Sequence, residues 1–159
     1  MLINMQYGRD GLDFDLPRDN VTVIRPQYVA GLEDEQKSFV AAVNAPIQTS
    51  PLVELIQDDD RIAVVIADIT RPLPSERLLT WLFSELCHVP RENFTIIIGT
   101  GSHRDCTAEE IESIVGIEVA SRYRIINHNS FDDDALELVG HLAGENGDLK
   151  FNKEYVHAD

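Results

Sequence analysis

Three stretches of the chain, of which the first is a continuous apolar run, have apolar and β-branched residues that predict buried strands. They read RIAVVIA (61–67), FTIIIG (94–99) and YRIINH (123–128), and each has the length of one strand. A strand without polar alternation is typical of a sheet that is covered on both faces. Helical spacing of apolar residues separates the first two stretches, over residues 75–87. The order of strands and helices therefore predicts an α/β domain with right-handed crossovers.

The sequence from Thr107 onward predicts two helical segments and a short tail. Thr107 and Glu110 have the spacing of a capping box, which predicts a helix that begins there and ends near Gly116. A short helical stretch is expected at 132–139. The tail is expected to turn at Asn146 and Gly147, to form a strand at 149–151 and to begin a helix at Asn152.

The first third of the chain predicts smaller elements. LINMQYG and LDFDLP alternate around the turn residues RDG, which indicates a β-hairpin. Another short strand is expected within NVTVIRP (20–26), followed by a helix over 33–44. Ser50 and Pro51 then favour the start of a short helix that reaches Ile56. Together these features predict a Rossmann-like open sheet, mostly parallel, with helices on both faces and an N-terminal β-hairpin.

Composition narrows the class of protein. The 159 residues suit a single α/β domain, 1–159, with 43% hydrophobic and 26% charged residues. A net charge of −15 repels nucleic acid and anionic membranes, so neither is expected as a partner. The sequence has no secretory signal pattern and no run of membrane-spanning length. Only two cysteines are present, which favours the reducing cytoplasm over a disulfide framework.

Polar and ionisable residues follow all three buried strands. The first strand leads into Asp68, Thr70 and Arg71, the second into GTGSHRDCT (99–107), and the third into NHN (127–129). Because ligands of open α/β sheets bind beyond the carboxyl ends of the strands, these residues are expected around one crevice. A guanidinium at that edge suits a carboxylate or phosphate. The residues alone predict a site for a small anion.

The chemistry of that site stays open at the level of single residues. His103 is as often a solvated loop histidine as an acid/base group, although its neighbour Arg104 favours a functional role. Ser102 next to His103 is a weak candidate for a nucleophile and its base, because adjacent residues seldom have the required geometry. His103 and Cys106 supply only two metal ligands, which do not make a site.

Several longer motifs resemble the N-terminal domain of the nickel-dependent lactate racemase family. They are YGRDGLDFDLP (7–17), ADITRPLP (67–74), GTGSHRDCTAEE (99–110), YRIINHNS (123–130) and FNKEYVHAD (151–159). They occur in the order of the family and cover nearly the whole chain. The resemblance implies the N-terminal domain of a longer two-domain enzyme that interconverts the stereoisomers of lactate or a related 2-hydroxy acid.

The resemblance also implies a cofactor and residue roles. The cofactor would be a nickel pincer nucleotide, which takes a hydride from C2 of the substrate and returns it. His103 would be one of two acid/base histidines. Arg71 would bind the substrate carboxylate or an anionic group of the cofactor, Asp68 would fix the local network, and Thr70, Ser102 and Arg104 would complete the anion-binding set.

One departure from the family pattern limits what this chain is expected to do. The lysine that carries the cofactor, the histidine that binds nickel and the second acid/base histidine of the family lie beyond Asp159. The chain alone is therefore expected to hold no metal and to be inactive, with the C-terminal cofactor-bearing domain as its partner. The alternative is a module that binds a small carboxylate or phosphate without catalysing a reaction.

Overall fold

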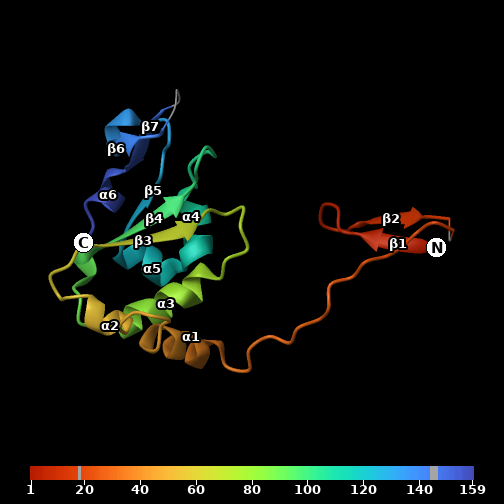
Figure 1. Ribbon diagram of the computed structural model, residues 1–159, viewed down its shortest axis with the longest axis horizontal. Coiled ribbons are helices and arrows are strands. Elements are labelled where there is room, and N and C mark those ends of the chain that lie inside the picture. The colour runs from red at the N-terminus through yellow and green to blue at the C-terminus, as the bar shows by residue number, and fades with distance from the viewer. Residues whose placement is uncertain (18, 144–146) are drawn as a thin grey trace. The chain divides into compact units, whose positions relative to one another are not determined.

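The computed structural model describes residues 1–17, 19–143 and 147–159 (Figure 1). Contacts between Cα atoms divide the chain into two compact units, Met1–Glu33 and Asp34–Asp159. The sequence is expected to form a single domain, and that expectation stays a prediction. Among the described residues, no helix is both long and apolar enough to cross a membrane.

The first unit contains the predicted β-hairpin. Strands β1 (Leu2–Met5) and β2 (Leu12–Asp15) pair antiparallel, with Ile3 opposite Phe14. Gly11 has a φ of 74°, and a Cβ atom there would lie 2.8 Å from the Asn4 side chain, so the turn requires glycine. The predicted strand at 20–26 is wrong, because these residues form no strand. A β-branched run becomes a strand only where a neighbouring strand accepts and donates its backbone hydrogen bonds.

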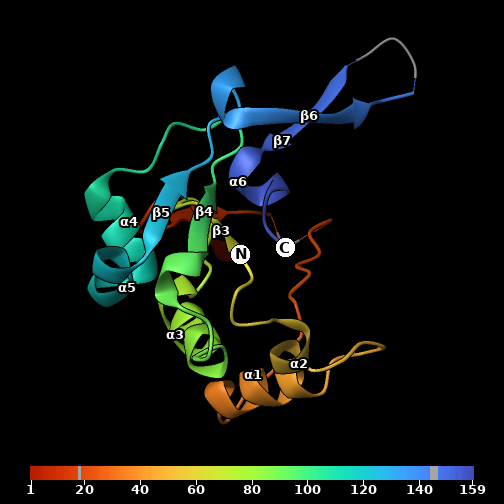
Figure 2. The ribbon, with the colours of Figure 1, turned by 90° about the vertical axis from the view of Figure 1, so that its left-hand side faces the viewer.

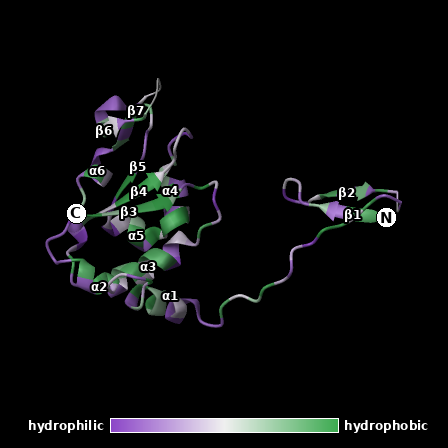
Figure 3. Ribbon diagram, in the orientation of Figure 1, coloured by the Kyte–Doolittle hydropathy of each residue, from purple (hydrophilic) through white to green (hydrophobic). Residues whose placement is uncertain are grey.

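A parallel sheet forms the centre of the second unit. Its strands are β3 (Ile62–Ala67), β4 (Phe94–Gly99) and β5 (Arg124–Asn127), in the spatial order β3-β4-β5. Strands β3 and β4 are hydrophobic along most of their length, and β5 is hydrophobic at its two central residues (Figure 3). The register pairs the last residues of β3 and β4, Ala67 and Gly99. The predicted parallel α/β sheet is thus confirmed, and its strands end at a common edge.

Three helices cover one face of this sheet (Figure 2). They are α3 (Ser75–Glu85), α4 (Ala108–Val115) and α5 (Ile117–Arg122). Their side chains pack against the strand residues of that face in one buried cluster, whose members are Ile66, Leu79, Ile96, Ile98, Cys106, Val115 and Val119. The capping box at the start of α4 is confirmed, since Thr107 and Glu110 exchange both hydrogen bonds.

The other face of the sheet is covered less completely. Side chains alternate along a strand, so Ala63 and Val65 point away from the three helices. The short helix α6 (Lys153–Val156) approaches this face, where Tyr155 lines a cavity with Ala63. Helices therefore lie on both faces, but unevenly. Val65 is 54% exposed, so the prediction that β3 is covered on both faces is wrong at this position.

The remaining helices of the second unit support α3 and the start of the sheet. Helix α1 (Glu35–Asn44) packs on α3, where the rings of Phe39 and Trp81 lie 5.8 Å apart. The predicted short helix is present as α2 (Leu52–Leu55), although its N-cap is Pro51 and the Ser50 side chain does not cap it. A single 3₁₀ turn, Arg91–Asn93, leads into β4.

The tail forms a second antiparallel ribbon. The helix predicted at 132–139 is wrong: a 3₁₀ turn at Asp133–Ala135 leads directly into strand β6 (Leu136–His141). Strand β7 (Asp148–Asn152) pairs with β6, and α6 follows it as predicted. The partner strand decides the outcome, because it supplies the backbone hydrogen bonds that a helix would otherwise make internally. The expected turn at Asn146 lies outside the described residues.

Candidate active site

The carboxyl ends of the three parallel strands bring their connecting loops together. The loop after β4 is joined to the end of β5 by two hydrogen bonds: the Thr100 hydroxyl donates to the carbonyl of His128, and the His128 amide donates to the carbonyl of Ile98 at 2.9 Å. Thr100 is buried, so this junction is shielded from water. The segments that follow β4 and β5 are therefore held together at the same edge of the sheet.

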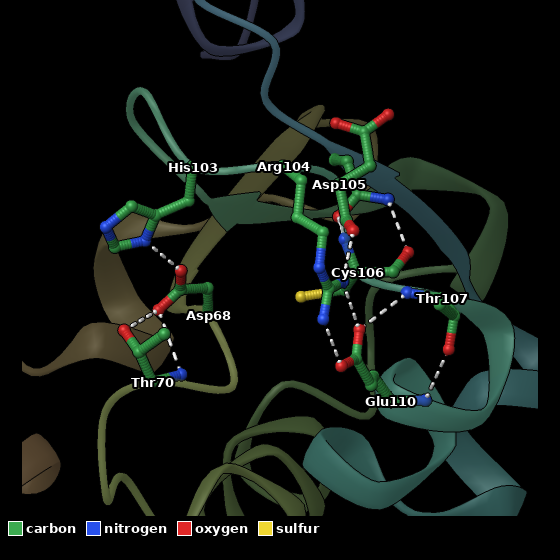
Figure 4. Close-up of polar contacts among 9 residues, drawn as sticks. Asp68, Thr70, His103, Arg104, Asp105, Cys106, Thr107 and Glu110 are labelled. Carbon is green, nitrogen blue, oxygen red and sulfur yellow. Dashed lines mark hydrogen bonds and ion pairs between the residues drawn. The ribbon is translucent and has the colours of Figure 1, made fainter.

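At this edge Asp68 and His103 form a hydrogen-bonded pair (Figure 4). The imidazole Nδ1 of His103 lies 2.6 Å from Oδ2 of Asp68. The other carboxylate oxygen accepts hydrogen bonds from the Thr70 hydroxyl at 2.6 Å and from the Thr70 amide at 3.2 Å. Asp68 is only 5% exposed, whereas the His103 side chain is 52% exposed. A buried carboxylate thus holds an imidazole whose far side is open.

The electrostatics of the pair favour an ionised carboxylate. The hydrogen bond from His103, followed by the one from the Thr70 side chain, lowers the pKa of Asp68 to about 2. Asp68 is therefore an acceptor at neutral pH, and Nδ1 of His103 donates to it. This fixes the neutral ring in the tautomer whose Nε2 has a free lone pair. The arrangement can accept a proton at Nε2 and return it, as a general acid/base requires.

This geometry does not support Ser102 as a nucleophile with His103 as its base, and it does not support a metal site of His103 and Cys106. Ser102 is exposed, and the hydrogen bond of His103 goes to Asp68 instead. Cys106 is buried in the apolar cluster, so it is not presented to a metal beside His103. Within residues 1–17, 19–143 and 147–159, no three His, Cys, Asp or Glu side chains are grouped to hold a metal ion.

Arg104 has an internal partner. Its guanidinium forms two hydrogen bonds with the Glu110 carboxylate, at 2.7 and 2.8 Å, in a bidentate pair. The same carboxylate accepts from the Thr107 amide at 2.9 Å. These contacts lower the pKa of Glu110 to about 2, with Arg104 as the main cause, and they raise the pKa of Arg104. Arg104 therefore ties the loop to the start of α4.

Arg71 lies on the other side of its loop. Ile69 and Arg71 line a cavity of about 570 Å³ beside helices α3 and α4, whereas Asp68 and Thr70 bond toward His103. Among the described residues, no hydrogen bond or ion pair joins the Arg71 side chain to Asp68 or His103. The structure thus brings Asp68, Thr70 and His103 together and leaves Arg71 facing a separate space.

One further residue of the site received no role from the sequence. Asn127, the last residue of β5, makes two hydrogen bonds with the backbone of Cys106, three residues after His103. An amide side chain at the carboxyl end of a buried strand was the available signal, because a polar group there needs a partner. The identity of that partner depends on where the preceding loop returns.

Comparison with known proteins assigns the chain to a family. Residues 7–159 match the lactate racemase N-terminal domain. This chain belongs to that family. The resemblance found in the motifs is therefore confirmed, as is the α/β fold with its N-terminal hairpin, because a solved lactate racemase structure matches the whole chain.

Two lactate racemases show how far the relationship extends. The protein from Thermoanaerobacterium thermosaccharolyticum is 30% identical over 161 aligned residues, which cover 99% of this chain and 38% of the relative. The protein from Lactiplantibacillus plantarum is 32% identical over 126 residues, covering 79% and 30%. The chain thus spans less than two fifths of the length of these racemases.

Solved structures give the same result. The lactate racemase apoprotein from Thermoanaerobacterium thermosaccharolyticum superimposes with a TM-score of 0.78 at 29% identity, over 100% of this chain and 37% of the relative. A protein from Thermotoga maritima matches 72% of this chain with a TM-score of 0.56 at 26% identity. The sequence and the fold of this chain therefore both match those of the lactate racemase N-terminal domain family.

Proposed function

We propose that this chain is the N-terminal domain of a racemase that acts on lactate or a related 2-hydroxy acid, and that it supplies an acid/base histidine to the active site. The observation that carries the proposal is the Asp68–His103 pair, with 2.6 Å between the buried carboxylate and the exposed imidazole. It lies at the ligand-binding edge of the sheet, in a chain of the lactate racemase family.

Racemisation of a 2-hydroxy acid requires a proton acceptor that is also a donor. Transfer of the C2 hydride to an acceptor and of the hydroxyl proton to a base would give a planar 2-oxo acid. Return of the hydride to the opposite face of C2, with a proton to the oxygen, would invert C2. Nε2 of His103 takes the hydroxyl proton and later returns it. Asp68 stabilises the imidazolium formed in between, because its carboxylate remains ionised at neutral pH. A second histidine, expected outside this chain, would serve the other face.

The nickel pincer nucleotide implied by the family resemblance fits this chain in part. It supplies hydride acceptance and return when it is bound. Its anionic groups match a guanidinium, and Arg71 has no ion-pair partner among the described residues. Its metal does not match, since the described residues hold no cluster of metal ligands. We therefore assign the acid/base and anion-binding roles to this domain, and nickel binding to the C-terminal domain.

The anion-binding role rests on Arg71. Arg71 lines the cavity beside α3, and Pro72 restricts the backbone that carries it. The substrate carboxylate and an anionic group of the cofactor are the two ligands expected for it. Because Arg71 faces a space separate from His103, the anionic group of the cofactor fits its position better. Thr70, Ser102 and Arg104 are proposed as further hydrogen-bond donors to the anion. Thr70 and Arg104 already donate to Asp68 and Glu110.

The partner and the compartment follow from the same proposal. Lactate racemases extend well beyond the region that this chain matches, so the partner is the remaining, cofactor-bearing domain. Both Cys87 and Cys106 are free, which suits a reducing cytoplasm.

The test is the variant His103→Ala in a full-length protein that contains this domain. Loss of the acid/base group is expected to lower the turnover of lactate by at least ~100-fold. The matched control is His141→Ala, because His141 pairs with Asp148 on the tail ribbon. Polarimetry or a chiral lactate assay gives the rates. Near-normal turnover of the His103 variant would reject the assignment.

The cavity beside α3 supports a second candidate, a module that binds a small anion without chemistry. In that case Arg71→Ala removes binding of lactate or phosphate, as it would in a racemase. Only a measurement of turnover distinguishes the racemase from the binding module, because only a racemase interconverts the isomers in the full-length protein.

A further inference from the structure

We infer that Asn127 is a positioning residue for His103. Its side-chain amide fastens the backbone of Cys106 to the end of strand β5 and thereby holds the loop of His103 against Asp68. The geometric part of this inference concerns the described chain alone. Its effect on turnover rests on the proposed racemase function.

The contact reproduces the hydrogen bonding of a neighbouring strand. Oδ1 of Asn127 accepts from the Cys106 amide at 3.0 Å, and Nδ2 donates to the Cys106 carbonyl at 3.1 Å. A side-chain amide offers an acceptor to the N–H and a donor to the C=O of the same residue, whereas a carboxylate offers acceptors only. Both residues are at least partly buried, so water competes weakly for these bonds.

The position of the Asn127–Cys106 contact along the loop gives it its importance. On one side of His103, the loop is joined to the sheet through the Thr100 hydroxyl and the His128 carbonyl. The His103 amide also donates to the Thr100 carbonyl at 3.0 Å. On the other side, Asn127 ties Cys106 to the sheet. His103 therefore lies between two attachments to the carboxyl end of β5, at Asn127 and at His128.

Another attachment on that side leads to a different element. Arg104 and Thr107 bond to Glu110, which belongs to α4. Asp68, the partner of His103, follows strand β3 directly. Because Asp68 moves with the sheet, a tie from the loop to the sheet fixes the distance between Asp68 and His103 more directly than a tie to a helix. This is the specific contribution of Asn127.

The first experiment measures the tautomer of His103 by ring-nitrogen NMR in the 159-residue chain. In the unaltered chain, the neutral ring is expected to be mainly the Nδ1–H form, because Nδ1 donates to Asp68. In Asn127→Ala, a mixture of the two tautomers is expected. The matched control is Asn129→Ala, which removes only a local hydrogen bond to the Phe131 amide and should leave the tautomer unchanged.

Retention of the Nδ1–H form in Asn127→Ala would overturn the inference. Should that variant fail to fold, Asn127→Asp supplies the same readout: it retains an acceptor for the Cys106 amide but loses the donor to the Cys106 carbonyl. A partial shift toward the mixture is expected from it, and an unchanged tautomer would again contradict the role.

Turnover in the full-length protein gives an independent reading. Asn127→Ala is expected to lower kcat by about 10-fold, with KM changed less than about twofold, because the substrate-binding groups are retained. A rise in KM with unchanged kcat would reject the positioning role. If His103→Ala remains active, the proposed function fails, but the tautomer measurement still decides whether Asn127 positions the ring.

Discussion

Asp68 shows how a single buried side chain can fix the orientation of an imidazole. One of its oxygens accepts from His103 and the other from Thr70, and nearly all of its surface is removed from water. These hydrogen bonds favour the charged form more strongly than burial opposes it, so the pKa of Asp68 falls to about 2. The carboxylate is therefore ionised at neutral pH and accepts the hydrogen bond from Nδ1 of His103.

This lowered pKa predicts a dependence of stability on pH. A carboxyl whose pKa falls from 3.8 to about 2 on folding stabilises the folded state above pH 4, and this contribution is lost as the pH falls from about 4 to 2. We expect the free energy of unfolding to decrease more steeply across that window in the natural chain than in Asp68→Asn. Urea denaturation at several pH values measures both slopes. Parallel slopes would show that the carboxyl does not have the lowered pKa.

At the scale of the elements, the start of helix α4 connects local stability to the site. Thr107 and Glu110 satisfy each other's backbone amides, and Glu110 also binds Arg104 in the loop of His103. The helix end and the active-site loop therefore share one carboxylate. A change at the cap is expected to affect the helix first and the loop second.

The capping box yields a stability prediction. Thr107→Ala removes the side-chain acceptor for the Glu110 amide and is expected to lower the free energy of unfolding by about 1 kcal/mol. Thr107→Ser retains the hydroxyl and serves as the matched control, with a much smaller expected loss. Chemical denaturation compares the two variants. Equal losses would mean that the hydroxyl makes no net contribution.

At the scale of the whole molecule, the proposed enzyme is expected to share its active site between this chain and another domain. The chain covers 38% of one lactate racemase and 30% of another. In this part, the described residues contain the hydrogen-bonded pair of Asp68 and His103 and place Arg71 at a cavity, but they contain no cluster of metal ligands. The domain is therefore expected to contribute proton transfer and anion binding to a reaction that it does not complete.

The isolated chain is accordingly expected to be inactive. Purified residues 1–159 should neither racemise lactate nor retain nickel after dialysis, because the groups expected to hold the cofactor lie elsewhere. A chiral lactate assay and elemental analysis of the same sample test both points. Turnover by the isolated chain would show that it contains a complete active site.

The sequence by itself determined the parts of the fold that depend on neighbouring residues. The three apolar β-branched runs predicted the strands of the parallel sheet, and Thr107 with Glu110 predicted the start of α4. The order of these elements also placed Asp68 and His103 at one edge. Such features are readable because side-chain periodicity and capping act over a few residues.

The tertiary structure decided what depends on contacts between distant segments. Local sequence did not decide the structure of residues 20–26 and 132–139. Residues 20–26 have no partner strand and form no strand, whereas part of 132–139 pairs with β7 and becomes strand β6. The hydrogen bond of His103 to Asp68, the pairing of Arg104 with Glu110 and the turning of Arg71 toward α3 depend on how the loops pack. Sequence predicts which polar groups reach an edge, but their partners are set by the three-dimensional path of the chain, since each buried polar group bonds to whatever packing brings near it.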